Sequence, residues 1–532
     1  MSRLKRAIDL IDRAVGAVDP ERALRREVAR KQIQILNTGY SHHGASNIKK
    51  SLIGWQSSGG DADSDIVANI PKLRERSRDL IMGMPIATGA VKTIRTNVVG
   101  SGLRLNASID YEFLGLTSEA ADEWEVNTER EFRMWADSKN CDASRTMTFG
   151  QLQGLALISA LASGDVFATL PLIPRAGSVY DLRINLIEAD RVNDPSPKPP
   201  GKNIYGGIEI GDYGESIACY IERSHPLAQN RTGQRVWDRV EFYGKETGRV
   251  NVLHITQDWE RPGQRRGAPL LSPVIETLKQ LGRYTDAELM AAVIAGMFTV
   301  FIRSQTPENP IGEAIPLEQQ VDADDPNSIE LGPGAIVGLG DGEDIVVANP
   351  SRQNTAFDQF VTSVCRQVGV ALEIPYELLV KHFTASYSAS RAALLEAWKM
   401  FRMRRVWMVQ SFCQPVYEEW LAEAVAKGRI QAPGFFEDPA RRAAWCGAKW
   451  YGPSQGHLNP LQEATAAKVR IDEEISTRER EAAEFSGESW EDIHPVRVRE
   501  ESARRRDKTG PQPETIQTES EEETEDEGGE DE

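Results

Sequence analysis

Hydrophobic residues near the start of the chain follow a helical spacing. From Asn69 to Val99 they recur at three- and four-residue steps, which predicts one amphipathic helix, and the glycines within residues 100–102 end it. The apolar face of this predicted helix consists of Leu73, Leu80, Ile81, Ile86, Val91, Ile94 and Val98.

The next region mixes helix and strand patterns. A second helix is predicted over residues 149–163 and ends at Gly164. Three runs rich in β-branched and aromatic residues follow, at 166–173, 182–189 and 218–222, and they predict strands. We therefore expect an α+β fold that is mostly helical.

The middle of the chain predicts two helices that flank a compact insert. Residues 270–302 have a helical pattern with Pro273 near its start, and a second helix is expected at about 355–371, before Pro375 breaks the run. Residues 304–350 are dense in Pro, Gly and Asp, which predicts a small β-rich or irregular insert. A helix of about 20 residues is about 30 Å long. The helix pair would therefore carry the insert away from the main body.

One long helix is predicted over residues 386–428, followed by a charged amphipathic helix or helix pair at 459–484. A serine caps the start of the long helix, Gly428 ends it, and Pro415 predicts a kink. Packing is favoured over base stacking as the role of its aromatic stripe, because aromatic residues at helical spacing more often lie in a core. The stripe consists of Trp398, Phe401, Trp407, Phe412, Tyr417 and Trp420.

The two ends of the chain carry opposite charge. Residues 1–50 hold eleven Lys or Arg against five acids, and their apolar residues lie near helical spacing, so this segment is either a solvated amphipathic helix or a functional basic arm. Residues 511–532 hold eleven acids and no base, with almost no apolar side chains. Such a composition predicts disorder.

A polar stretch at residues 59–65 predicts a flexible break with a superficial likeness to a calcium loop. Asp61, Asp63 and Asp65 alternate like the first ligands of an EF-hand. Ile66, however, stands where that loop requires Gly, and Lys72 where it requires a bidentate Glu. We therefore expect no calcium site.

Length and net charge restrict the function only broadly. A chain of 532 residues should fold as several modules. The formal net charge is −18, of which the last 22 residues contribute −11. Because a protein that grips DNA usually carries a basic surplus, any contact with DNA should be loose and independent of base sequence.

Signatures of catalysis, cofactors and metals are missing from the sequence. It contains no GxxxxGK[ST], GxSxG or HExxH motif, and none of its seven histidines lies three or four residues from another. The five cysteines form no CxxC pair, which favours a reduced, cytoplasmic setting. No signal peptide or run of about 18 apolar residues occurs, so no membrane insertion is expected.

Several segments, in order, resemble the lambda-type portal proteins of tailed bacteriophages. The most specific are VLHITQDWERPGQRRGAPLLSPVIETLKQLGRYTDAEL at 252–289 and SYSASRAALLEAWKMF at 386–401. Asn459 departs from the family, which often has Asp there, and SGESWEDI matches the family's Gly-Asp-Trp pattern only loosely. The remaining segments of the series, which spans roughly residues 70–490, are 74–105, 148–170, 184–195, 206–221 and 459–481.

The resemblance implies a portal fold with a wing, a two-helix stem, a clip, a channel loop and a crown. It also implies a ring of about twelve subunits at one capsid vertex. The expected division is a basic, partly flexible N-terminal arm at 1–65, an α+β wing at 66–265, a first stem helix at 266–302, a clip at 303–352, a second stem helix at 353–374, a channel loop at 375–390, a long helix and wing return at 391–454, a crown at 455–510 and a disordered acidic tail at 511–532.

The same resemblance implies partners and a location. Double-stranded viral DNA would pass non-specifically through the channel. The large terminase subunit would dock during packaging and head-tail adaptor proteins afterwards, and major capsid and scaffold proteins would surround the ring. The protein would lie in the virion at the portal vertex, and in the host cytoplasm during assembly.

Two sets of residues are candidates for these roles. The first would form a DNA-facing channel loop or, alternatively, an ordinary solvated connection: Lys381, His382, Thr384, Ser386, Tyr387 and Ser388. The second would pack the stem between subunits, since a lone helix pair would leave it partly exposed: Leu278, Leu281, Leu289 and Val293. Two other functions remain open at this point: another capsid-associated structural protein, such as a minor head protein or scaffold, and a soluble enzyme.

Overall fold

The computed structural model shows a mostly helical α+β protein, as the patterns predicted. The chain divides into two units, Met1–Asp61 and Ala62–Glu532. Among the described residues no helix is both long and apolar enough to cross a membrane. The described residues are 19–22, 25, 28, 51, 52, 55, 59–229, 233–256, 258–297, 300–303, 336–339, 357–383, 386–456, 460–486 and 490–507.

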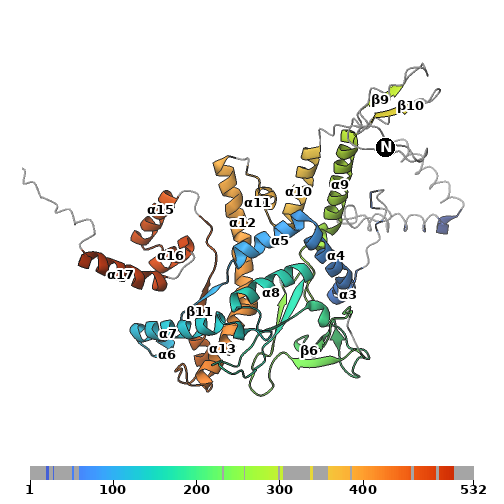
Figure 1. Ribbon diagram of the computed structural model, residues 1–532. Helices are drawn as coiled ribbons and strands as arrows, with labels where there is room; N and C mark the ends of the chain where they lie inside the picture. The colour runs from blue at the N-terminus through green and yellow to red at the C-terminus, as the bar shows by residue number, and fades with distance from the viewer. Residues whose placement is uncertain are drawn as a thin grey trace, which may run out of the picture. The chain divides into compact units, whose positions relative to one another are not determined.

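Helices and small antiparallel sheets make up the region before residue 260 (Figure 1). The helices are α3 (Ala62–Val67), α4 (Ile70–Gly83), α5 (Pro85–Val98), α6 (Tyr111–Leu114), α7 (Ser118–Ala136) and α8 (Phe149–Ser163). One sheet has the order β3 (Asn185–Ile187), β2 (Asp165–Thr169), β8 (Val252–Thr256), and a second has the order β4 (Ile204–Tyr205), β5 (Ile208–Ile210), β6 (Ser216–Glu222), β7 (Trp237–Glu241).

The later part of the described chain is again helical. Its elements are α9 (Ile275–Met297), β9 (Val300–Arg303), β10 (Ile336–Leu339), α10 (Phe357–Leu372), α11 (Tyr376–Val380), α12 (Tyr387–Met408), α13 (Gln414–Ala426), α14 (Pro439–Trp445), β11 (Ala448–Tyr451), α15 (Pro460–Asp472), α16 (Arg478–Ser486) and α17 (Trp490–Asp507). Strand β11 pairs antiparallel with β1 (Arg104–Ala107), and β9 pairs parallel with β10.

The predicted single helix over 69–99 is wrong, because the structure divides it into α4 and α5. Met84 lies between them in an extended conformation, with φ −110° and ψ 112°. Pro85 is the cause: a proline pushes the preceding residue out of the helical region, while the proline itself suits the first turn of the next helix.

Two further predictions need correction. The expected flexible break at 59–65 contains the start of α3, where Asp63 accepts a hydrogen bond from the backbone N–H of Arg265 at 2.9 Å and Asp65 accepts one from Arg261 at 2.6 Å. The stretch expected to be helical to residue 302 is helical only to Met297, and β9 begins at Val300.

The sequence predicted either one charged helix or a pair of helices at 459–484, and the structure has a pair, α15 and α16.

The long helix over 386–428 is interrupted in the way Pro415 predicts. Ser386 caps α12, a π-helical turn spans Val409–Cys413, α13 follows, and Gly428 lies at φ 67° after its end. Proline cannot donate the hydrogen bond of a continuous α-helix, and the wider π turn absorbs the mismatch.

The aromatic stripe of this helix lies in the core, which confirms the interpretation as packing. Phe412, Tyr417 and Trp420 are fully buried. Phe132 of α7 forms the centre of the cluster, with its ring centroid 5.0 Å from that of Trp420 and 5.6 Å from that of Tyr417. The core therefore joins α7 to α13, which lie far apart in sequence.

A buried carboxylate holds the sheet region against α4 and the loop before α9. Asp165, at the start of β2, accepts hydrogen bonds from Arg74 of α4 at 2.7 Å and from Arg266 at 2.6 Å. His254 of β8 lies 3.1 Å from the same carboxylate and stacks on Phe167. Burial alone would raise the pKa of Asp165, but the two guanidinium groups hold it well below its usual range.

The loop around Arg266 also requires a close backbone approach. A Cβ atom on Gly164, at φ 92°, would lie 2.1 Å from the carbonyl oxygen of Gly267. Arg266 uses its remaining N–H groups on the carbonyl oxygens of Ala189 and Val192. This arrangement fixes the start of the segment that leads into α9.

Replacing Asp165 by alanine should destabilise the fold strongly. Two buried guanidinium groups would lose their carboxylate, which typically costs about 3–5 kcal/mol. Urea unfolding followed by circular dichroism measures the change. Asp238→Ala is the matched control: its partner Arg223 lies 2.9 Å away on the surface, and an exposed pair contributes under about 1 kcal/mol. Equal, small losses in both variants would contradict a structural role for Asp165.

Candidate functional site

Helix α9 is buried at its beginning and exposed further along. Leu278 and Leu281 are fully buried, and Gly282 lies against Met84, so this part of α9 is anchored to the core of the chain. Leu289 is 64% exposed and Val293 42% exposed. Of the four predicted stem residues, the first two therefore pack within the subunit and the last two face outward.

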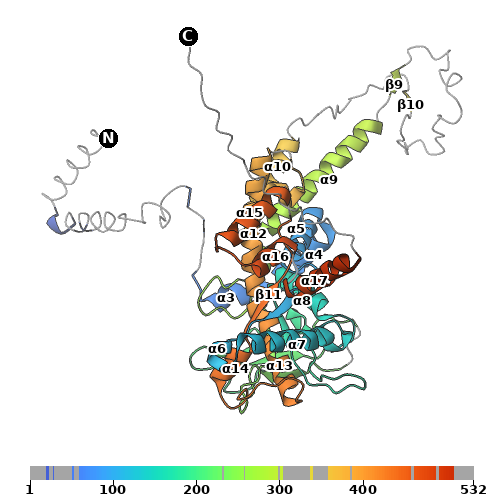
Figure 2. The same ribbon diagram turned by 90° about the vertical axis from the view of Figure 1, so that its left-hand side faces the viewer.

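Helix α10 packs beside the middle of α9. The ring of Tyr284 on α9 stacks on Phe357 with centroids 5.5 Å apart and meets Phe360 edge-on at 4.9 Å. Figures 1 and 2 both show the two helices leaving the main body together. The two helices therefore pack against each other.

Helices α9 and α10 carry several large apolar side chains that are exposed in the described part of the chain. An exposed Leu or Phe alone is ordinary, but several on adjacent elements are typical of a protein interface. The stem surface, as we name this set, consists of Leu289, Met290, Val293, Phe360 and Val370, which are all between 42% and 82% exposed.

The predicted channel loop lies between α11 and α12. Lys381 ends α11 in a left-handed conformation at φ 55°, and the backbone N–H of His382 donates to the carbonyl oxygen of Glu377 at 3.0 Å. The side chains of Lys381, His382 and Phe383 are exposed.

Ser386 and Ser388 lie at the start of α12. The Oγ of Ser386 accepts a hydrogen bond from the backbone N–H of Ala389 at 3.4 Å, so it serves as the N-cap, and Ser388 is exposed in the first turn. Tyr387 begins the helix, and Thr384 lies outside the described residues. The structure therefore brings the described members of the set to one connection between two helices.

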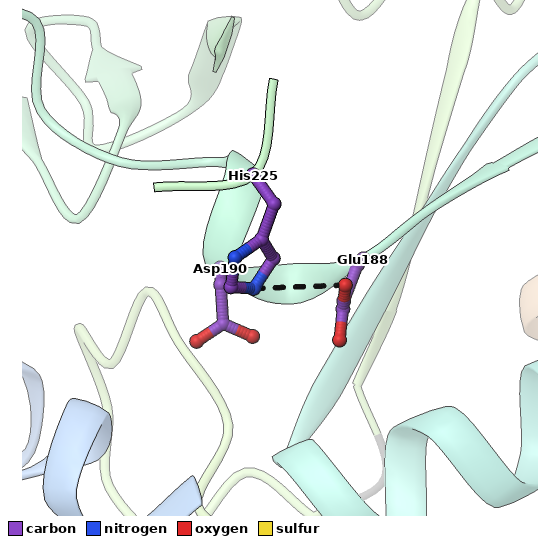
Figure 3. A group of neighbouring side chains, drawn as sticks. All are labelled: Glu188, Asp190 and His225. Atoms are coloured by element: carbon purple, nitrogen blue, oxygen red, sulfur yellow. Dashed lines mark ion pairs between the residues drawn. The ribbon is translucent and has the colours of Figure 1, made fainter. Parts of the chain in front are cut away.

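Glu188, Asp190 and His225 form a cluster that could hold a metal ion by distance alone, since their ligand atoms lie within 4.8 Å of one another (Figure 3). The Nε2 atom of His225 lies 3.7 Å from Glu188. Arg78 of α4, however, donates to Asp190 and lies 3.3 Å from Glu188. Because its guanidinium already supplies the positive charge between the carboxylates, we interpret the group as an ion-pair cluster.

Sequence reasoning missed the buried charge network and the exposed residues around the stem. Asp165, Arg74 and His254 lie far apart in sequence and follow no motif. Met290, Phe360 and Val370 belong to ordinary helical patterns. The proline, glycine and arginine residues at 262–269 were the available signal for a constrained loop.

Most of the predicted clip, the predicted acidic tail and the predicted N-terminal arm lie outside the described residues. Val300–Arg303, at the boundary between the predicted first stem helix and the predicted clip, pairs as a parallel strand with Ile336–Leu339 of the predicted clip. All five cysteines are buried free thiols. Burial raises the pKa of Cys141 and of Cys219 to about 12.

Comparison with known proteins gives one family. Residues 49–405 match the family described as phage portal protein, lambda family. Portal protein B of Escherichia phage lambda is 23% identical over 88% of this chain and 90% of its own length. The portal protein of Escherichia phage N15 is 25% identical over the same shares.

Solved structures with a similar chain include the necks of gene transfer agent (GTA) particles. The neck of the native particle, computed with C12 symmetry, has a TM-score of 0.36 and 13% identity over 71% of this chain and 93% of that chain. The neck of the empty particle, computed with C6 symmetry, has a TM-score of 0.38 and 12% identity over 71% of this chain and 94% of that chain.

Proposed function

This chain belongs to the lambda family of phage portal proteins, and we propose that about twelve copies form a ring through which double-stranded DNA enters and leaves the capsid. The family match covers most of the chain and carries the proposal. The portal proteins it resembles have a structural role, and we infer that this chain too acts without catalysis. The virion is its place of action, and assembly would occur in the host cytoplasm.

The exposed stem surface supports ring formation. Met290 is 58% exposed and Val370 82% exposed. Only the first turns of α9 are buried, so the described part of the subunit leaves these two side chains largely open to solvent. In a ring, each subunit could cover the stem surface of the next with a different surface of its own, which is the arrangement of a closed cyclic assembly. Leu278 and Leu281 would then hold the stem to the subunit, while Leu289 and Val293 would pack between subunits.

The proposed parts follow the expected boundaries. The wing would comprise 66–265, the first stem helix 266–302, the second 353–374, the long helix and wing return 391–454 and the crown 455–510. The clip at 303–352 would meet the large terminase subunit and later the head-tail adaptors. Major capsid and scaffold proteins would surround the ring. The channel loop at 375–390 would face DNA, because exposed polar and singly basic side chains can touch phosphates without a lasting grip.

Introducing acids into the stem surface should prevent ring formation. In Leu289→Glu/Val293→Glu, each interface would lose about 1.5–3 kcal/mol per buried side chain, or at least about tenfold in association. Val126→Glu is the control, because Val126 is 41% exposed on α7, away from the stem. Native mass spectrometry and negative-stain images should give rings for the unchanged chain and the control only. Monomers alone from the unchanged chain, over a wide concentration range, would refute the ring.

Deleting residues 306–330 from the clip should spare rings but abolish docking of the large terminase subunit. We expect docking here because the segment is rich in Pro, Gly and Asp, adds little to a core and lies between the two proposed stem helices. A binding assay between purified rings and terminase measures the loss. Undiminished docking by the deleted form would show that terminase binds elsewhere.

Acidic replacements in the channel loop should impair DNA packaging while leaving assembly intact. Lys381→Glu and His382→Glu would place negative charge beside the phosphates, and repulsion should shorten or release the packaged DNA. The length of DNA in purified particles measures the effect. Lys92→Glu, at an exposed position of α5, is the control. Particles of both loop variants with full-length, stably held genomes would mean that the loop is only a connection.

A further inference from the structure

A cavity of about 1050 Å³ separates α12 from α15 and α16. Its lining residues come from these three helices, which are labelled in Figure 1, and from residues 449–456. We name this cavity the crown groove. Its volume slightly exceeds the range of about 300–1,000 Å³ that is usual for small-molecule sites, so it has room for a short peptide segment.

Three of the four acidic side chains that line the crown groove, those of Glu479, Glu481 and Glu484, pair with basic residues. Glu479 pairs with Lys449 at 3.3 Å, and Glu484 pairs with Arg480 at 3.5 Å. Arg470 binds the carboxylate of Glu481 through two N–H groups. These three carboxylates are therefore not available to neutralise the other cations of the groove.

Two arginines on the α12 wall lack a carboxylate partner among the described residues. Arg402 is exposed and makes no ion pair there. The guanidinium of Arg405 donates only to neutral carbonyl oxygens, those of Pro453 at 2.7 Å, Asn97 at 3.0 Å and Val98 at 3.1 Å. Burial, and then the charge of Arg402, lower the pKa of Arg405 to about 10. An anion in the groove would relieve this repulsion.

The same wall also offers apolar contacts. Leu394, Leu395, Trp398 and Val406 line the groove together with the two arginines. Leu395 is 46% exposed and Val406 54% exposed. The surface thus fits an acidic peptide segment with an occasional apolar residue better than it fits a free inorganic anion.

This chain contains a segment of that chemistry a few residues beyond the crown helices. Residues 511–532 hold eleven acids, no base and a single large apolar residue, Ile516. The segment begins four residues after Asp507, the last residue of α17, and α17 contacts α16 through Arg478 over the ring of Trp490. A short tether raises the effective concentration to the millimolar range, so even weak affinity suffices.

We propose that the acidic segment 511–532 binds in the crown groove of its own chain, with its carboxylates at Arg402 and Arg405. The segment would neutralise the α12 wall and fill the space between α12 and the crown helices. Ring assembly does not depend on this contact, because the stem surface lies on other elements. Failure of this proposal therefore leaves the proposed function untouched.

A synthetic peptide of residues 511–532 tests the contact directly. It should bind to the chain truncated after Gly510, measured by fluorescence anisotropy, and affinity should fall as salt is added. Arg402→Glu should weaken binding about tenfold or more, as reversal of one contacting charge implies. The matched control is Arg130→Glu, at an exposed position of α7. Equal weakening by both variants, or no binding, would overturn the proposal.

Hydrogen exchange on the assembled protein tests the contact in the full chain. Residues 449–456 and 478–486 should exchange more slowly in the full-length protein than in the truncated one, and Arg402→Glu should remove the difference. Identical exchange in both would overturn the proposal. Protection that survives truncation but disappears in monomers would assign the groove to a neighbouring subunit instead. Duplex DNA that binds in the groove where the peptide does not would assign it to nucleic acid.

Discussion

The buried carboxylate of Asp165 is the point on which the arrangement of the subunit depends. It joins α4, the sheet of β2 and β8, and the loop that leads into α9, through Arg74, His254 and Arg266. A buried charge is costly unless its partners are fixed, so each of these segments constrains the others. The network therefore fixes the loop that leads into α9, and the buried Leu278 and Leu281 anchor the first turns of the helix itself.

Burial changes sharply along α9, and this change separates two tasks. Its first turns hold Leu278 and Leu281 in the core, while Leu289 and Val293 lie on the surface. A projecting helix pair cannot cover its own outer face, because each helix shields only the side that meets its partner. Exposure of these apolar side chains to water has an unfavourable free energy, which a neighbouring subunit would reduce by covering them.

The long helical segment contributes to both the aromatic core and the crown groove. Tyr417 and Trp420 of α13 pack into the core around Phe132, whereas Arg402 and Arg405 of α12 line the crown groove. The π turn at Val409–Cys413 joins the two halves. A π turn adds one residue to the helical turn, so it changes which side chains of the two halves lie on the same face.

Local patterns in the sequence determined most helices, the α+β class, the two helices on either side of residues 304–350 and a departure from regular α-helix near Pro415, because these follow from spacing and from single prolines and glycines. The same reasoning overlooked the break at Met84, where Pro85 outweighs an unbroken apolar pattern. Only the tertiary structure decided which residues meet. It brings Asp165 to Arg74 and Arg266, whereas Arg402 has no carboxylate partner in the described part of the chain. Such contacts join segments far apart in the chain, and burial, not local spacing, gives them their strength.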